Sequence, residues 1–130
     1  MAPGVAWWIT LSDTVAEPGR PVEVRVRMHN TTATPVEVRV PSSREQGVDV
    51  IVADARGGVV WHRNHGFEPD LIGYPLNIPA GDSLVWTAVW TQRDTVGNAV
   101  SAGEFWVRAV IANRFPTDSG TGSVRLRVRR

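Results

Sequence analysis

The fold is decided by the stretch VEVRVRMHN at residues 22–30, which is followed after a short polar segment by VEVRVP at residues 36–41. In both stretches an apolar side chain alternates with a charged or polar one. Successive side chains of a β-strand point to opposite faces, so each stretch would bury one face and expose the other. The segment between them opens with Asn-Thr-Thr, which is typical of a turn. The two stretches therefore predict two consecutive, half-buried strands.

The same alternation recurs along the chain and predicts about eight strands. They are expected at residues 7–11, 22–29, 36–41, 48–52, 59–61, 84–91, 105–111 and 124–128. Clusters of Gly, Pro, Asn and Asp separate these stretches, and no segment shows the period of an amphipathic helix. Many short strands of this kind favour two packed antiparallel sheets, with Trp86 and Trp90 between them. We therefore predict an all-β antiparallel sandwich.

Composition narrows the class of protein further. A length of 130 residues with 42% hydrophobic and 21% charged residues predicts one folded domain over residues 1–130. The absence of cysteine excludes disulfides, thiolate metal ligands and cysteine nucleophiles. A formal net charge of +1 gives no field that would hold nucleic acid or an anionic membrane, and the arginines alternate along strands as solvated faces. Neither nucleic acid nor a membrane is expected as a partner, and the oligomeric state stays open.

The connection over residues 62–83 stands out because it is long and contains no convincing strand, although residues 76–78 could pair briefly. Loops of this length are uncommon in compact domains and are often functional. The connection carries Phe67, Leu71 and Tyr74, so it is not a solvated linker. Large apolar side chains on a fixed loop are usual anchors of a protein interface. These three residues are our candidates for partner binding, and the alternative is that they only plug the end of the sandwich.

The polar residues form no recognisable catalytic or metal site. His62 and His65 have a spacing that shares a face only on a helix, and the sequence suggests no third ligand. Asp54 or Asp70 could orient one of these histidines, but the chain contains no nucleophile motif. We expect no enzymatic activity, no catalytic residue, no metal and no cofactor.

The tryptophans divide into two groups by their place in the alternation. Trp7 and Trp61 fall in the buried phase of their strands and are expected in the core. Trp8 and Trp106 fall out of phase and are expected on an outer sheet face. There they would cover arginine stems, or form an exposed aromatic platform for a sugar ring or a partner protein.

Four segments follow one another in a distinctive order: VEVRVRMHNTTATPVEVRVPSS (22–43), VDVIVADARGGVVWHRNHGF (48–67), LNIPAGDSLVWTAVW (76–90) and AGEFWVRAVI (102–111). In this order they resemble the BsuPI family of bacterial intracellular proteinase inhibitors. Together they cover about residues 20–112. The N-terminal Trp-Trp strand and the arginine-rich last strand depart from the family pattern, as do the valines on either side of Asp49.

The resemblance implies an immunoglobulin-like sandwich that binds a protein, and inhibition of a serine proteinase through a surface loop. The family offers no reactive-site motif that can be transferred to this chain residue by residue. The alternative hypothesis is a structural or accessory module of a bacterial surface or exported protein, which could bind carbohydrate. The first twelve residues lack a secretory signal, so the chain would be cytoplasmic if the family name applies, or exported if a leader was removed.

Overall fold

The computed structural model describes residues 3–68, 70, 72–112 and 120–130, and these form strands and no helix. The strands are β1 (Val5–Leu11), β2 (Val15–Ala16), β3 (Val22–Asn30), β4 (Val36–Pro41), β5 (Val48–Asp54), β6 (Val59–His62), β7 (Gly73–Ile78), β8 (Ser83–Trp90), β9 (Gly103–Ile111) and β10 (Val124–Val128). The predicted all-β class is confirmed.

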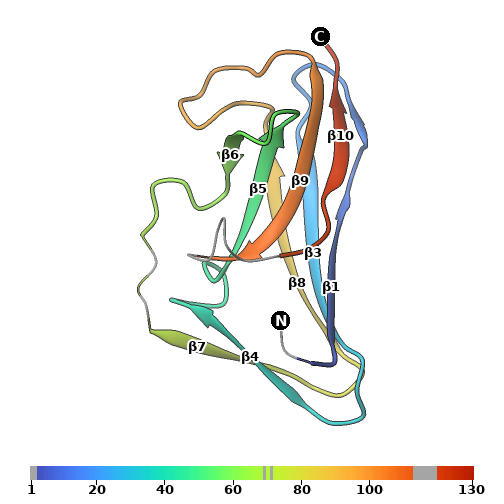
Figure 1. Cartoon of the computed structure of the whole chain (residues 1–130), viewed down its shortest axis with the longest axis vertical. Coiled ribbons are helices and arrows are strands. Elements are labelled where there is room, and N and C mark those ends of the chain that lie inside the picture. The colour runs from blue at the N-terminus through green and yellow to red at the C-terminus, as the bar shows by residue number, and fades with distance from the viewer. Residues whose placement is uncertain (1–2, 69, 71, 113–119) are drawn as a thin grey trace.

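The strands form two larger sheets and a small one (Figure 1). One sheet has the order β1-β3-β8, the other has the order β2-β10-β9-β5-β6, and β4 pairs with β7. Neighbouring strands are antiparallel except for the short parallel pair of β2 with β10. The two larger sheets pack face to face, which confirms the predicted antiparallel sandwich.

The core between the sheets follows from the alternation along the strands. In β3 the four apolar side chains from Val22 to Met28 are at most 1% exposed, while the charged residues between them face outward. Trp86 and Trp90 fill the interior as predicted, with 2% and 1% exposure. The ring of Trp90 lies 5.6 Å from that of Phe105 on the opposite sheet, in a tilted arrangement that aromatic pairs favour.

A sharp corner links the first larger sheet to the small one. The pair β3/β8 continues as the pair β4/β7, because both chains turn at the same level, through residues 31–35 and 79–82 (Figure 1). Asn30 is fully buried at this corner. Its Nδ2 donates to the carbonyls of Thr34 (2.8 Å) and Ile78 (2.9 Å), one from each turning chain. One side chain therefore fixes both turns.

The structure differs from the sequence expectations in two respects. Strands β2 and β7 add to the predicted eight, and β7 occupies a good part of the connection that was expected to lack a convincing strand. Trp7 and Trp61 are half-buried and pack against the core from its margin. They lie on β1 and β6, which are edge strands, so each indole has a neighbouring strand on one side only.

Candidate functional site

The loop over residues 63–72 joins β6 to β7 and presents large apolar side chains to solvent. Phe67 is 39% exposed, Ile72 is 77% exposed, and Tyr74, at the start of β7, is 44% exposed. Large apolar side chains exposed on one segment are typical of a surface that binds a partner. Leu71, the third predicted anchor, lies outside the described residues.

The first end of this loop is fixed by Asp49, which is only 7% exposed. Asp49 and His62 lie on the same outer face, since Ile51 pairs with His62 and Asp49 is two residues before Ile51. His62 Nδ1 is 2.7 Å from Asp49 Oδ2, and the carboxylate accepts this hydrogen bond. Its Oδ1 also accepts the backbone N–H of Asn64 at 3.1 Å. The carboxylate thus holds both the end of β6 and the first turn of the loop.

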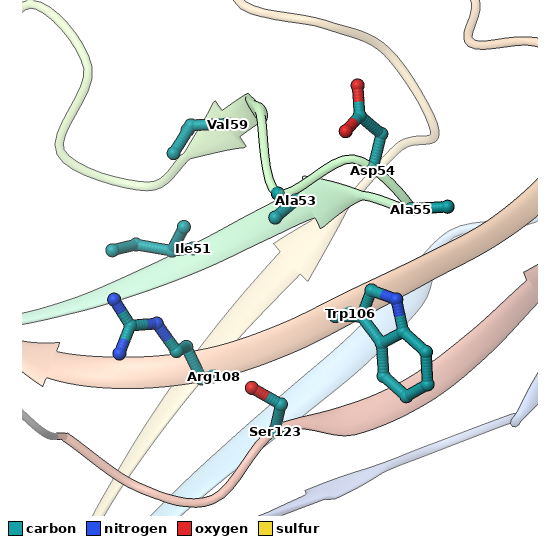
Figure 2. A pocket seen from close by; sticks show the side chains of 9 residues that line it. Ile51, Ala53, Asp54, Ala55, Val59, Trp106, Arg108 and Ser123 are labelled. Atoms are coloured by element: carbon teal, nitrogen blue, oxygen red, sulfur yellow. The ribbon is translucent and has the colours of Figure 1, made fainter. Parts of the chain in front are cut away.

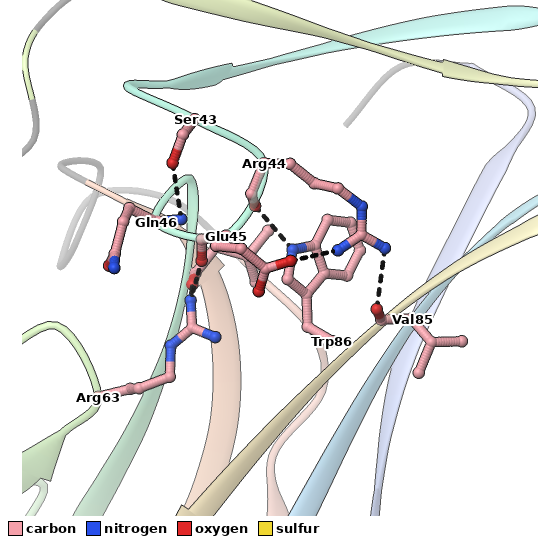
Figure 3. A network of polar contacts seen from close by, with 8 residues as sticks. Ser43, Arg44, Glu45, Gln46, Arg63, Val85 and Trp86 are labelled. Atoms are coloured by element: carbon pink, nitrogen blue, oxygen red, sulfur yellow. Dashed lines mark hydrogen bonds and ion pairs between the residues drawn. The ribbon is translucent and has the colours of Figure 1, made fainter.

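Two further side chains tie the loop to the neighbouring loop over residues 42–47. Asn64 Nδ2 donates to the Gln46 carbonyl at 2.9 Å. Arg63 Nη2 donates to the carbonyls of Glu45 and Val48, and Figure 3 shows its guanidinium beneath Glu45. Burial lowers the pKa of Arg63, and the nearby negative charges of Asp49 and Glu45 oppose that shift. The cation is therefore compensated where it is buried.

The neighbouring loop is in turn attached to the core through Trp86 (Figure 3). Trp86 Nε1 donates to the Arg44 carbonyl at 2.8 Å, and the Arg44 guanidinium lies 4.8 Å from the indole centroid. Arg44 Nη2 also donates to the Val85 carbonyl at 3.0 Å, on β8. A chain of contacts therefore runs from the buried indole to the exposed loop.

The second end of the loop is also held by hydrogen bonds. Ser42 N–H donates to the Ile72 carbonyl at 3.1 Å, directly before β7 begins its pairing with β4. Ile72 N–H donates to Asp70 Oδ1 at 3.1 Å. The apolar side chains therefore project from a segment whose two ends are fixed. This arrangement suits binding of a partner at low entropic cost.

The histidine pairings differ from those considered from sequence. His62 is oriented by Asp49, whereas Asp54 accepts the N–H groups of its own turn and Asp70 accepts that of Ile72. The ring of His65 meets that of His62 edge to face at 5.7 Å. A useful signal for Asp49 was present in the sequence, because it is the one charged residue in the otherwise apolar stretch VDVIV. The exposure of Ile72 had no comparable signal.

The two candidate platform residues lie on different sheets. Trp8, on β1, is 39% exposed, and Trp106, on β9, is 37% exposed. Their strands belong to the two opposing sheets of the sandwich, so the structure does not bring the two indoles together. Any aromatic platform would have to use one of them alone.

The residues that the structure describes contain no group of three or more His, Asp or Glu side chains placed to hold a metal ion. They also contain no helix with the length and apolarity needed to cross a membrane.

Solved structures with a similar fold belong to proteins of diverse function. The chain is similar to the Pseudomonas fluorescens alkylpurine DNA glycosylase AlkC bound to abasic-site DNA, with 13% identity and a TM-score of 0.56 over 98% of this chain and 31% of that one. It is similar to the β-glucosidase EmGH1 from Erythrobacter marinus, with 12% identity and a TM-score of 0.56 over 96% of this chain and 15% of that one. The CARDB domain of PF1109 from Pyrococcus furiosus gives 12% identity and a TM-score of 0.50 over 96% and 94% of the two chains.

These similarities concern the fold alone, because the identities are low and the chain spans under a third of the first two proteins. The CARDB domain supports the immunoglobulin-like class. A comparison with curated proteins found no significant match. The family model for BsuPI, described as intracellular proteinase inhibitor, matches residues 9–115. With most of its length matched, the chain belongs to the BsuPI family.

Proposed function

We propose that the chain inhibits a serine proteinase by presenting the loop over residues 63–72, together with Tyr74, to the proteinase's active-site cleft. The observation that carries this proposal is the contrast between a firmly fixed loop base and the exposed Phe67, Ile72 and Tyr74. Membership of a proteinase-inhibitor family supports the partner class. The chain would act as a binding protein, without chemistry of its own.

A fixed loop suits this role for a physical reason. Part of the cost of binding is the ordering of flexible segments, and a loop tied at both ends has met that cost during folding. Aromatic and aliphatic side chains that enter pockets supply most of the affinity at such interfaces. Phe67 and Tyr74 would be the aromatic anchors, and Leu71 and Ile72 the aliphatic ones.

The composition of the loop also indicates which proteinases fit. Between Asn64 and Tyr74 there is no lysine or arginine, and the charged residues are Glu68 and Asp70. A cleft whose main specificity pocket carries a negative charge would gain no ion pair from this segment and would be repelled by its carboxylates. We therefore propose a proteinase with an apolar specificity pocket, inside the cell if the partner shares the compartment named by the family.

The test is an inhibition assay with subtilisin and trypsin, which prefer apolar and basic residues respectively. We expect inhibition of subtilisin and little effect on trypsin. Ile72→Ala and the double variant Phe67→Ala/Tyr74→Ala should each raise the inhibition constant about tenfold or more. The matched control is Val96→Ala, because Val96 is 77% exposed like Ile72 but lies in the loop between β8 and β9.

The outcome is decisive only for folded variants, so circular dichroism and the thermal midpoint are measured for each. Wild-type inhibition by the folded double variant would remove the loop assignment. Equal losses in the Ile72 and Val96 variants would show that the loss does not depend on the loop. Inhibition of neither proteinase, nor of others with apolar specificity, would overturn the proposed function.

A further inference from the structure

A hollow of about 310 Å³ lies on the outer face of the five-stranded sheet. It sits over β5 and β9, beside the turn that joins β5 to β6 (Figure 2). Its lining residues are Ile51, Ala53, Asp54, Ala55, Gly57, Val59, Trp106, Arg108 and Ser123. The proposed inhibitory function uses none of them.

The hollow exists because small residues face a large one across the sheet. Ala53 on β5 pairs directly with Trp106 on β9, and Ile51 pairs with Arg108. The methyl group of Ala53 leaves the side of the indole uncovered, and Figure 2 shows Ser123 between Trp106 and Arg108 at the opposite margin. The Trp106 indole forms one side of the hollow and small side chains such as Ala53 form its base, and such a site can accept a flat, partly apolar ring.

The polar groups around this wall favour a neutral ligand. The hollow is lined by one carboxylate, from Asp54, and one guanidinium, from Arg108, which also has an interaction of its own, so the lining carries no excess of one charge. The carboxylate is held in place, because its Oδ1 accepts the N–H groups of Arg56 and Gly58, both at 2.9 Å. Within the described part of the chain, the Trp106 indole N–H and the Ser123 hydroxyl make no hydrogen bond. The margin thus offers both donors and acceptors to a ligand.

We propose that this hollow binds a sugar ring of a neutral oligosaccharide, with the ring stacked on the indole of Trp106. A pyranose ring has apolar C–H faces and hydroxyl groups around its edge, which matches an aromatic wall with a polar margin. The volume is at the lower end of the range for small-molecule sites, roughly 300–1,000 Å³, so it has room for a single ring. The rest of the oligosaccharide would extend over the sheet.

This site is independent of the proteinase-binding loop. The loop is anchored at Asp49, near the start of β5, whereas the hollow adjoins Asp54 at the end of the same strand. The hollow reaches along β5 as far as Ile51, but its aromatic wall, Trp106, pairs with Ala53, and four residues of extended strand separate Ala53 from Asp49 by about 13 Å. Substitutions in the hollow should therefore leave proteinase inhibition unchanged, and loop substitutions should leave sugar binding unchanged.

The experiment is a titration of the 15N-labelled chain with cellohexaose, laminarihexaose, xylohexaose and chitohexaose, each up to about 10 mM, since a one-ring site implies millimolar affinity. The indole N–H signals are followed and that of Trp106 is assigned from the Trp106→Phe variant. We expect at least one of these oligosaccharides to shift the Trp106 signal in a saturable manner. Hexagalacturonate, which is anionic, should bind more weakly than the best neutral oligosaccharide.

The matched control is Trp8, the equally exposed indole on the other sheet. Trp106→Ala should weaken binding about tenfold, the loss expected for one aromatic stacking contact, and Trp8→Ala should leave it unchanged. If Trp106→Ala does not fold, the wild-type shift alone locates the site. The proposal fails if no neutral oligosaccharide shifts the Trp106 signal, if Trp8→Ala weakens binding as much as Trp106→Ala, or if hexagalacturonate binds best.

Discussion

Replacing Asp49 by alanine should both destabilise the protein and weaken inhibition. The substitution removes the acceptor for His62 Nδ1 and for the Asn64 N–H, both of which fix the first turn of the binding loop. It also removes one of the two carboxylates that compensate the buried cation of Arg63. The result would be a buried donor without a partner and a cation with less support.

The magnitude follows from the burial of each contact. A buried N–H left without a partner costs about 1–3 kcal/mol, which applies to Asn64. The His62 side chain is 33% exposed, so water can replace much of its pairing, and we assign it no more than about 1 kcal/mol. With the reduced compensation of Arg63, we expect the free energy of unfolding to fall by about 2–4 kcal/mol. Domains of this size have about 5–15 kcal/mol, so the variant should still fold.

The assay combines urea denaturation with the inhibition constant for subtilisin and with hydrogen exchange of the amides at residues 63–68. Faster exchange in this segment should accompany the weaker inhibition. Asp49→Asn should lose less stability, because its amide oxygen can still accept the Asn64 N–H.

The matched control is Asp94→Ala. Asp94 also accepts two backbone N–H groups, from Val96 and Asn98, but in the loop between β8 and β9. It should lose stability without losing inhibition. The reasoning is refuted if Asp49→Ala unfolds within about 0.5 kcal/mol of the wild type, the range of an ordinary surface substitution. Lower stability with unchanged inhibition would refute the role of the fixed loop.

Two further predictions concern the corner and the neighbouring loop. Asn30→Ala should lower the free energy of unfolding by about 2–4 kcal/mol in urea denaturation, because it leaves the buried carbonyl of Ile78 and the part-buried carbonyl of Thr34 without their donor. A loss below about 1 kcal/mol would contradict the role of this residue. Gly47→Ala should lower the thermal midpoint more than Gly57→Ala. A Cβ at Gly47 would lie 2.6 Å from the Ser43 carbonyl oxygen, whereas a Cβ at Gly57 would meet nothing within 4 Å and would cost only the strain of a φ of +84°. The opposite order of thermal midpoints would contradict this packing argument.

The sequence predicted the sandwich well because burial of alternate side chains is a local property. In a strand with one apolar face, such as VEVRVRMHN, the sequence alone shows which side chains are buried. On that basis Trp86 and Trp90 were correctly predicted to lie in the core. Strand β7 was underestimated because its apolar residues, Leu76 and Ile78, are few and follow Pro75. Its pairing with β4 depends on the corner, which is a tertiary feature.

The candidate loop could be predicted only in part. Its length and its apolar content identified Phe67 and Tyr74 as candidate anchors for a partner, and the structure exposes both side chains. The way in which the loop is fixed could not be predicted, because Asp49 contacts His62 and Asn64 across 13 and 15 residues of sequence. Likewise, the hollow beside Trp106 depends on the register that places Ala53 opposite the indole. Register between strands is set by the whole sheet.

The position of the loop over residues 63–72 depends on Asn30, which lies at the corner at the opposite end of the β4/β7 pair. Strand β7 lies between the loop and the corner, so the β4/β7 pair forms an arm that is attached to the corner at one end and to the fixed loop at the other. Six residues of strand give this arm a length of about 20 Å, and a tilt of about 10° at the corner would move its far end by roughly 3 Å. A change in the packing of Asn30 that tilted the arm by this angle would displace Tyr74 by most of the width of a side chain, without altering any residue that a partner touches.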